Sequence, residues 1–440
     1  MGVADTGDEA TPPKPGWRYY LQQKVLVIFF LGFSAGLPFP LVYSTLSAWL
    51  SDAGLNKSTI STFAWLGFAY SFKFVWAPIV DSTRIPILTG ILGRRRAWLI
   101  TAQLGILLAL FVMSNVDPAN FLQLFTYIAI AVAFLSATQD IVLDAYRIEI
   151  GDDKMQGPLA ASYQYGYRMA MFVGGAGALA IADLGSWSIA YKAMAIAMGV
   201  GLITTLLCKE PTVDRKLSAR LSETGLTRAA AWFRDSVAGP FVDFFRRYGR
   251  YGLIVLLFVA CFRLSDIVLG ILANPFYLDI GFTKTEIAIV SKTYGIWVSF
   301  AGIAVAAWAI VKYGPTKCIV PAAILYATTN LAFLALAHAG PDVWVFAGVI
   351  TADNFAQGFA GSVGIAYLSS LTSLAFTATQ YALFSSLGSF FGKLTAGFSG
   401  NVQEAVGWAA FFLYVAALGI PAIILSVIIS RHEDGPKRPT

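Results

Sequence analysis

The sequence is poor in the side chains that build reactive centres. Its 440 residues include only two histidines, and its three cysteines, Cys208, Cys261 and Cys318, are scattered through apolar runs without a CxxC spacing. Such a set provides neither zinc ligands nor a Ser–His or Cys–His nucleophile pair, and it argues against disulfides. We therefore expect no metal, no cofactor and no catalytic residue.

Charge is scarce as well. Charged residues make up 13% of the chain and hydrophobic residues 57%, whereas a soluble domain carries about 25% charged residues. A soluble protein of this composition could not cover its surface. The apolar residues suffice for twelve helices of about 20 to 25 residues, the length that crosses a bilayer. The composition predicts an all-α polytopic membrane protein and not an enzyme.

Apolar runs bounded by polar residues, glycine or proline give twelve predicted spans. These begin near residues 25, 58, 97, 120, 158, 187, 252, 285, 318, 342, 379 and 407. The single long connection follows the sixth span, so the spans divide six plus six. We expect an N-terminal tail (1–23), a six-helix lobe (24–208), an amphipathic linker on the membrane surface (209–250), a second six-helix lobe (251–430) and a C-terminal tail (431–440).

The distribution of Lys and Arg predicts the orientation of the chain. Outside the predicted spans, only Lys57 and Lys284 fall on the side opposite the termini. Positive residues are retained on the cytoplasmic side of a membrane. We therefore expect both termini and the linker to be cytoplasmic. The net charge of +6 is then explained by orientation and does not indicate nucleic-acid binding.

Two short repeats support the division into halves. The stretch from Asp52 to Ile60 recurs from Asp279 to Ile287, and Gly185-Ser186-Trp187 is echoed by Val406-Gly407-Trp408. The two members of each pair occupy equivalent positions in their halves. Six-helix halves repeated in one direction are typical of two-lobed transporters of the major facilitator type, whose substrate site lies between the lobes near the middle of the membrane.

Charged side chains within the spans are the strongest functional candidates, because each costs roughly 2.5 to 3.5 kcal/mol at mid-helix. Arg263 and Asp266 lie three residues apart and could form an ion pair on one helix face. The slight excess of deep bases suits a substrate with a carboxylate or phosphate. Locking the lobes together is the alternative role for each charge. The candidate substrate-binding residues are Lys73, Arg168, Arg263 and Lys292, with Tyr167, Gln139 and Asn354 beside them.

A second group of candidates concerns protons and gating. Asp140 and Asp144 share a helix face one turn apart, so either one carries a proton or both bind the Arg94-Arg95-Arg96 cluster as an inner gate. The candidate proton carriers are Asp266, Asp353 and Asp140, and the candidate gating residues are Asp81, Arg94, Arg95, Arg96, Asp144 and Arg147.

Proline and glycine predict helix breaks and close helix contacts. Pro38 and Pro40 are expected to interrupt the first span of one half, and Pro275 the first span of the other. The pair Gly32 and Gly36 has the GxxxG spacing that allows two helices to approach closely.

Several motifs together resemble one known family. They are Gly32-Phe33-Ser34-Ala35-Gly36-Leu37-Pro38, the stretch from Tyr70 to Asp81, Gly93-Arg94-Arg95-Arg96, the stretch from Ser136 to Ala145 with its Gln-Asp-x-x-x-Asp core, Gly166-Tyr167-Arg168, Lys292-Thr293 and the stretch from Ala378 to Leu383. Over about Lys24 to Ser430, the chain resembles the AmpG-type muropeptide permeases of the major facilitator superfamily.

This resemblance implies a function. It implies proton-driven import of anhydro-muropeptides, N-acetylglucosaminyl-anhydro-N-acetylmuramyl products of wall turnover, across the bacterial inner membrane for recycling, which in Gram-negative bacteria also feeds β-lactamase induction. The implied partners are an anionic amino-sugar or peptide substrate, protons and the lipid bilayer, and the protein is expected to act as a monomer. Acetyl-CoA and siderophores are the alternative cargoes, because transporters of these compounds share similar stretches. A membrane receptor or enzyme is the alternative of a different class.

Overall fold

The computed structural model describes residues 22–212 and 234–432 of the chain. Within these ranges all regular secondary structure is helical. Eight of the described helices are long and apolar enough to cross a membrane, and the bent pair Val343–Leu371 with Leu374–Ala396 can add a ninth. A helix begins within about three residues of each predicted span start except the last, where the helix Ser399–Leu418 begins earlier and is interrupted at Gly407, the predicted start. The chain is therefore a multi-pass membrane protein, while the number of twelve crossings and the cytoplasmic location of both termini stay predictions.

The helices before residue 208 pack against one another and are called the first bundle here. Its members are α1 (Gln23–Gly36), α2 (Pro38–Val42), α3 (Ser44–Asp52), α4 (Lys57–Thr62), α5 (Gly67–Ser71), α6 (Ala77–Ser82), α7 (Leu88–Leu92), α8 (Arg94–Met113), α9 (Leu122–Glu149), α10 (Gln156–Phe172), α11 (Ala178–Leu184), α12 (Trp187–Ala197) and α13 (Gly199–Leu207). Short 3-10 turns, Phe63–Leu66 and Lys73–Val75, join α4 to α6, and a π-helical turn, Val173–Gly177, joins α10 to α11.

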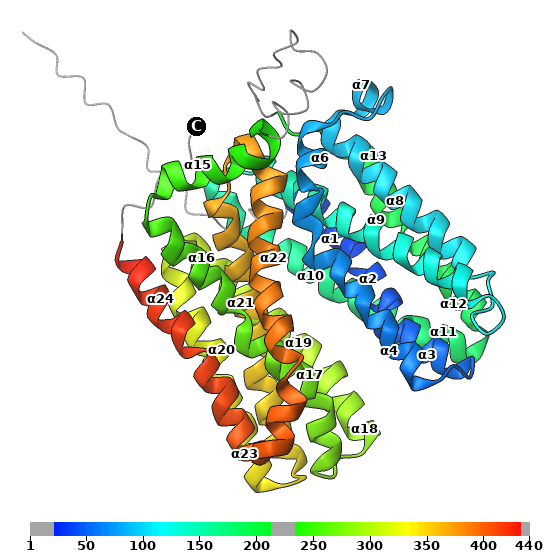
Figure 1. Cartoon of the computed structure of the whole chain (residues 1–440), viewed down its shortest axis with the longest axis vertical. Helices are drawn as coiled ribbons and strands as arrows, with labels where there is room; N and C mark the ends of the chain where they lie inside the picture. The colour runs from blue at the N-terminus through cyan, green and yellow to red at the C-terminus, as the bar shows by residue number, and fades with distance from the viewer. Residues whose placement is uncertain (1–21, 213–233, 433–440) are drawn as a thin grey trace, which may run out of the picture.

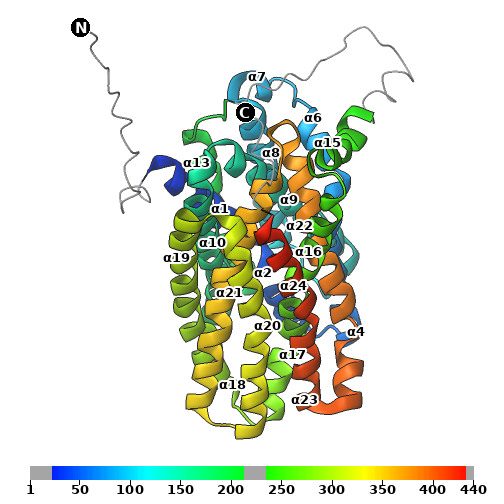
Figure 2. The same cartoon turned by 90° about the vertical axis from the view of Figure 1, so that its left-hand side faces the viewer.

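The helices from residue 251 onward form the second bundle. Its members are α16 (Tyr251–Phe262), α17 (Leu264–Asp279), α18 (Lys284–Ile287), a π-helical turn (Ala288–Tyr294), α19 (Gly295–Tyr313), α20 (Pro315–Ala339), α21 (Val343–Leu371), α22 (Thr377–Ala396), α23 (Ser399–Leu418) and α24 (Ile420–Arg431). Most of these helices run along the long axis of the molecule (Figure 2). The two bundles touch, because Ala160 of α10 packs into the core of the second bundle and Ala378 of α22 into the core of the first.

The connection between the bundles is described in part. Residues 213–233 of the predicted amphipathic linker lie outside the described residues, and residues 239–248 form helix α15 (Gly239–Tyr248). Helices α15, α6 and α7 lie at the same end of the molecule, which we call the linker end (Figure 1). The bundles converge at this end and diverge toward the end that carries α4 and α18 (Figure 1).

The first span of each half is broken near its middle. As predicted, Pro38 begins a new short helix after Gly36, and a second break follows at Tyr43 (φ −125°, ψ −98°). In the second half the prediction was wrong: Pro275 lies inside α17, and the helix is interrupted at Arg263 (φ −103°, ψ 6°) instead. A proline can remain in a membrane helix where neighbouring structure satisfies the freed carbonyl group. The break places Arg263 at a helix junction.

The two sequence repeats contact each other within each half. Trp187 Nε1 donates a hydrogen bond to Asp52 Oδ2 at 3.0 Å, and Trp408 Nε1 donates to Asp279 Oδ2 at 3.2 Å. Each bond ties the end of the half's first predicted span to the start of its last predicted span. The shared three-dimensional role supports the interpretation of these stretches as an internal repeat.

The repeats also begin the following helix in the same way. Asn56 Oδ1 accepts a hydrogen bond from the Thr59 backbone N–H at 2.8 Å, and at the matching position Thr283 Oγ1 accepts one from the Glu286 N–H at 3.2 Å. Glu286 in turn accepts hydrogen bonds from Thr283, which lower the pKa of its exposed carboxyl group. This reciprocal arrangement is a capping box.

Glycines allow close contact between helices in both bundles. A Cβ atom on Gly36 would lie 2.4 Å from the Tyr167 carbonyl oxygen, and one on Gly166 would lie 2.0 Å from that of Phe29, so α1 and α10 meet backbone to backbone. In the second bundle, a Cβ atom on Gly358 of α21 would lie 2.2 Å from the Ser299 carbonyl oxygen of α19. These contacts are of the kind that GxxxG patterns provide in membranes.

Replacing Gly358 with alanine is expected to destabilise the fold by about 1 to 3 kcal/mol, because the added methyl group must push α19 away from α21. Gly348 on the same helix provides a matched control, since a Cβ atom there would have no neighbour within 4 Å. Gly348→Ala should leave the melting temperature unchanged or raise it slightly. Thermal unfolding of the two purified variants measures the difference, and equal melting temperatures would contradict this account of the packing.

Candidate functional site

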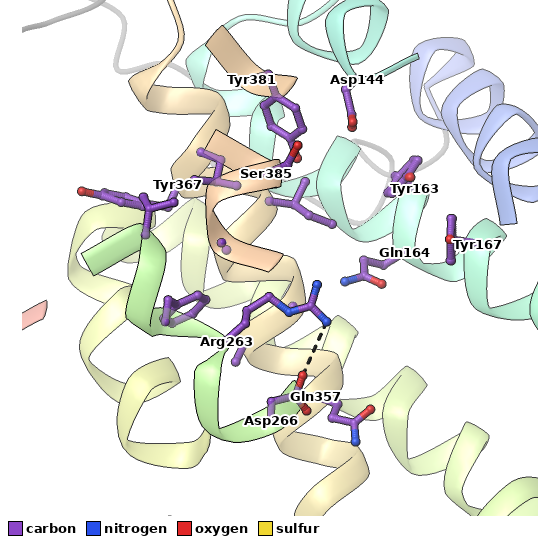
Figure 3. A pocket seen from close by; sticks show the side chains of 18 of the residues that line it. Asp144, Tyr163, Gln164, Tyr167, Arg263, Asp266, Gln357, Tyr367, Tyr381 and Ser385 are labelled. Carbon is purple, nitrogen blue, oxygen red and sulfur yellow. Dashed lines mark hydrogen bonds and ion pairs between the residues drawn. The ribbon is translucent and has the colours of Figure 1, made fainter. Parts of the chain in front are cut away.

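A cavity of about 480 Å³ lies between the two bundles. Its walls come from α2, α9 and α10 of the first bundle, with Lys73, and from α16, α17, α20, α21 and α22 of the second. The polar and aromatic side chains that line it are Phe39, Lys73, Asp140, Asp144, Tyr163, Gln164, Tyr167, Arg168, Phe258, Phe262, Arg263, Asp266, Tyr326, Gln357, Tyr367, Tyr381 and Ser385. Figure 3 labels ten of them, which come from the two bundles on opposite sides of this space.

The wall from the first bundle is rich in aromatic rings. Tyr163 and Tyr167 are one turn apart on α10, with ring centroids 5.7 Å apart, and Phe39 lies 6.4 Å from Tyr167. Gln164 of the same helix points into the cavity between the bundles (Figure 3). Flat rings beside an amide offer stacking surface and hydrogen-bonding groups, which suits the faces and polar groups of sugar rings.

The wall from the second bundle carries charge. Arg263 Nη2 pairs with Asp266 Oδ2 at 3.4 Å, as the spacing of three residues predicted, and half of the Arg263 side chain is exposed to the cavity (53%). In Figure 3 its guanidinium group extends toward Gln164 of the opposite bundle. An arginine held at a helix break, with one acidic partner, retains donors for a carboxylate or phosphate.

Arg168 lines the same cavity from α10. Its Nε atom is buried and makes no hydrogen bond to any described residue. Buried donors are rarely left unpaired, so this nitrogen is available to a bound group or to water.

Near the linker end of the cavity, Asp144 is shared by two bases. Its Oδ2 lies 3.6 Å from Lys73 Nζ, and its Oδ1 lies 3.5 Å from Arg147 Nη2. Asp140, one turn away on α9, lines the cavity with a side chain that is buried, and its Oδ1 accepts no hydrogen bond from any described residue. Of the two alternatives for these acids, binding to the Arg94–Arg96 cluster is therefore not what the structure has, since Asp144 pairs with Lys73 and Arg147 instead.

The arginine cluster has other partners. Arg95 is 1% exposed, and its guanidinium group pairs with Asp81 at 2.8 Å and with Glu149 at 2.7 Å. Arg94 Nη1 donates to the Asp81 carbonyl oxygen. Arg96 donates to the carbonyl oxygens of Thr205 at 2.9 Å and Leu206 at 2.7 Å. These bonds fix α6, α8, α9 and α13 together at the linker end.

Asp81 also reaches across to the second bundle. Its Oδ2 accepts hydrogen bonds from the Thr379 backbone N–H at 2.8 Å and from Thr379 Oγ1 at 2.9 Å. Thr379 lies in the first turn of α22, where unpaired N–H groups and the helix dipole favour a negative charge. A second bond between the bundles joins Arg147 Nη1 to Ser369 Oγ at 2.9 Å. The structure therefore closes the cavity at the linker end.

The neighbouring Gln380 connects this closure to the linker helix. Its Oε1 accepts hydrogen bonds from Arg247 Nη2 and from the Ser373 N–H, and its Nε2 donates to Asp243 Oδ2 and to the Pro240 carbonyl oxygen. Glu149, Thr379, Gln380 and Arg247 also belong to this closure, although their local sequence does not indicate a role in a gate. Thr379 and Gln380 lie in the stretch from Ala378 to Leu383, which is one of the motifs that carry the family resemblance.

Two of the predicted substrate-binding residues, Gln139 and Asn354, do not line the cavity. Gln139 is fully buried and donates to Ser34 Oγ at 3.2 Å, which makes it a contact between α9 and α1. Asn354 donates to the Ile350 carbonyl oxygen of its own helix at 3.2 Å. The side chain of Lys292 lies outside the described residues. Asp353, a predicted proton carrier, is buried behind the wall and accepts a hydrogen bond from the cavity residue Gln357 at 2.9 Å.

No group of three or more His, Cys, Asp or Glu side chains in the described part of the chain could hold a metal ion. The ionisable side chains that line the cavity are carboxylates, phenols, a lysine and two arginines.

Comparison with known proteins identifies the family. The transporter AmpG 4 of Rickettsia felis is 33% identical over 419 residues, covering 95% of this chain and 99% of the relative. The anhydromuropeptide permease of Escherichia coli K12 is 31% identical over 415 residues, covering 93% of this chain and 80% of the relative. The chain belongs to the AmpG family. A family model described as acetyl-coenzyme A transporter 1 matches residues 22–184.

Solved structures place this AmpG family member in the major facilitator fold. The proton:xylose symporter XylE has a TM-score of 0.66 at 14% identity, with 94% of each chain covered. The transporter FucP, solved in the outward conformation, has a TM-score of 0.66 at 15% identity, covering 93% of this chain and 99% of that chain. At such low identity these likenesses establish the fold alone.

Proposed function

We propose that this protein is a proton-driven importer of anhydro-muropeptides, the N-acetylglucosaminyl-anhydro-N-acetylmuramyl disaccharide with or without its peptide. It acts as a monomer and moves this cargo from the periplasm to the cytoplasm across the bacterial inner membrane for wall recycling. Its six-helix lobes (24–208 and 251–430) rock around the cavity, with both termini and the linker cytoplasmic. In this orientation the closed linker end is the cytoplasmic gate.

The observation that carries the proposal is the composition of the cavity. One wall presents the rings of Tyr163 and Tyr167, and the other presents the half-exposed guanidinium group of Arg263. An amino-sugar ring and a carboxylate would each find a partner there. The permease name of the Escherichia coli relative supports the same cargo.

Proton coupling is assigned to three carboxylates near the cavity, namely Asp140, Asp353 and Asp266. Asp140 is the leading candidate, because its Oδ1 accepts no hydrogen bond from a described residue and it lies on the cavity wall. Asp266 already pairs with Arg263, and Asp353 with Gln357. A carboxylate without such partners can exchange its proton without breaking a strong contact.

Asp140→Asn is expected to abolish gradient-driven accumulation while leaving exchange of cargo across the membrane intact. Co-transport of one proton with the singly charged disaccharide moves no net charge, so a pH gradient of one unit sustains an accumulation ratio of about tenfold, which this variant should lose. Asp183→Asn, at an exposed aspartate, is the matched control. Uptake and counterflow into proteoliposomes measure the two properties. Accumulation by Asp140→Asn at the wild-type level would exclude this residue as the proton carrier.

The proposed function is tested by uptake of radiolabelled anhydro-disaccharide into proteoliposomes under an inward proton gradient. We expect accumulation that a protonophore abolishes. Accumulation that a protonophore leaves unchanged would refute proton coupling, and no uptake above that of empty liposomes by folded protein would refute the cargo.

Acetyl-CoA is the second candidate cargo, because the acetyl-coenzyme A transporter model matches residues 22–184. Exchange of acetyl-CoA in the absence of a pH gradient, without uptake of the disaccharide, would favour this function.

A further inference from the structure

Three charged side chains form a line from the cavity to the closed linker end. Lys73 and Asp144 both line the cavity and are each less than one tenth exposed. Lys73 Nζ lies 3.6 Å from one oxygen of Asp144, and Arg147 Nη2 lies 3.5 Å from the other. The two oxygens of Asp144 therefore contact different bases, namely Lys73 at the cavity and Arg147 one turn nearer the linker end.

The far end of this line holds the two bundles together. Arg147 is completely buried and donates a hydrogen bond to Ser369 Oγ of α21 at 2.9 Å. Its guanidinium carbon lies 5.3 Å from the ring centroid of Tyr381 on α22 and 5.9 Å from that of Tyr163 on its own bundle. Cation–π contacts and a hydrogen bond from a charged donor both strengthen when they are shielded from water. Arg147 is thus a buried cross-link at the cytoplasmic gate.

The charge of Asp144 couples Lys73, at the cavity, to Arg147, at the contact between the bundles. A carboxylate flanked by two cations attracts each of them, and the attraction between two charges is several times stronger near a protein interior than in water. If another anion pairs with Lys73, Asp144 loses this partner and interacts with Arg147 alone. The arginine is then drawn toward α9 and away from its partners on α21 and α22.

We propose that Lys73, Asp144 and Arg147 form a relay through which an anionic group of the cargo weakens the cytoplasmic gate. A second carboxylate of the peptide-bearing cargo, distinct from the one that Arg263 binds, pairs with Lys73 and releases Asp144, which pulls Arg147 from Ser369 and Tyr381. The relay rests on the proposed function, because it requires an anion in the cavity. Within it, Asp144 is a positioning residue, since it acts on the gate through Arg147 and not through the cargo.

The rate of hydrogen–deuterium exchange at the contact between the bundles measures whether this gate opens. The Thr379 backbone N–H donates to Asp81 of the opposite bundle at 2.8 Å, so it should exchange faster when the bundles separate at the linker end. The probe is the anhydro-disaccharide with its peptide, which carries more than one carboxylate and can therefore occupy Arg263 and Lys73 at the same time. It is added at a saturating concentration, determined for each variant by calorimetry, so that differences in affinity do not enter the comparison.

In the wild-type protein, the saturating probe should accelerate exchange at Thr377–Tyr381 by about tenfold, the effect of losing one hydrogen bond to a charged group. Asp144→Asn should bind the probe and show no acceleration. Ser369→Ala should show fast exchange without the probe, because the acceptor of Arg147 is lost, and Arg147→Lys should retain part of the response. Asp183→Asn, remote from the relay, should respond like the wild type.

Two results would overturn the relay. Acceleration in Asp144→Asn equal to that in the wild type would show that the gate opens without it. Binding to the wild type without any change in exchange would show that cavity and gate are not coupled, while leaving the proposed cargo intact. Failure of the wild type to bind the probe would instead refute the proposed function, and the relay with it.

Discussion

Replacing Arg95 with methionine is expected to lower the free energy of unfolding by about 3 to 5 kcal/mol, the cost of removing one partner from a buried charge cluster. The guanidinium group is 1% exposed and pairs with both Asp81 and Glu149. Without it, two carboxylates at the linker end lose their shared counterion. The melting temperature of the purified variant in detergent should fall by several degrees.

Two comparisons make this prediction specific. Arg84→Met changes an exposed arginine of the same region and should leave the melting temperature nearly unchanged. The triple variant Arg95→Met, Asp81→Asn, Glu149→Gln also removes the two carboxylate charges that Arg95 neutralises, and it should regain part of the lost stability. A melting temperature for Arg95→Met equal to that of Arg84→Met would contradict the role assigned to the cluster.

Arg263→Ala is expected to raise the KM for the anhydro-disaccharide by about 10- to 100-fold. The reason is the loss of a charge-assisted hydrogen bond, which contributes about 1.5 to 3 kcal/mol. Half of this side chain faces the cavity, and its acidic partner Asp266 leaves several donors free. Initial rates of uptake measure KM for the variant and the wild type.

Arg263→Lys should recover part of the affinity, because it keeps the charge but loses the planar set of donors. Lys192→Ala is the control, since Lys192 does not line the cavity. An unchanged KM for Arg263→Ala would mean that the cargo binds elsewhere.

The features of the structure that the sequence predicted depend on neighbours along the chain. The ion pair of Arg263 with Asp266 follows from a spacing of three residues on a helix, and the break at Pro38 follows from the missing N–H group of proline. The glycine contact between α1 and α10 follows from GxxxG spacing. In each case the local sequence contains the physical cause.

The features that the sequence did not predict depend on residues far apart in the chain. Asp81 pairs with Thr379 at a separation of 298 residues, and nothing in either local sequence identifies the other. Asp144 was expected to bind the arginine cluster, but Glu149, five residues further along α9, takes Arg95 instead. Gln139 is a polar residue of a predicted span, yet its side chain donates to Ser34 and does not line the cavity. The sequence alone did not show this, because a helix face can be assigned only when its neighbours are known.

The most direct test of the account is a calorimetric titration of the purified protein with the anhydro-disaccharide and, separately, with the neutral amide of its carboxylate. The account places an anionic amino sugar between the tyrosine wall and Arg263. It therefore predicts that the acid binds at least about tenfold more tightly than the amide, the difference made by one charge-assisted hydrogen bond. Equal affinity for the two compounds, or no binding of either to folded protein, would contradict the central claim.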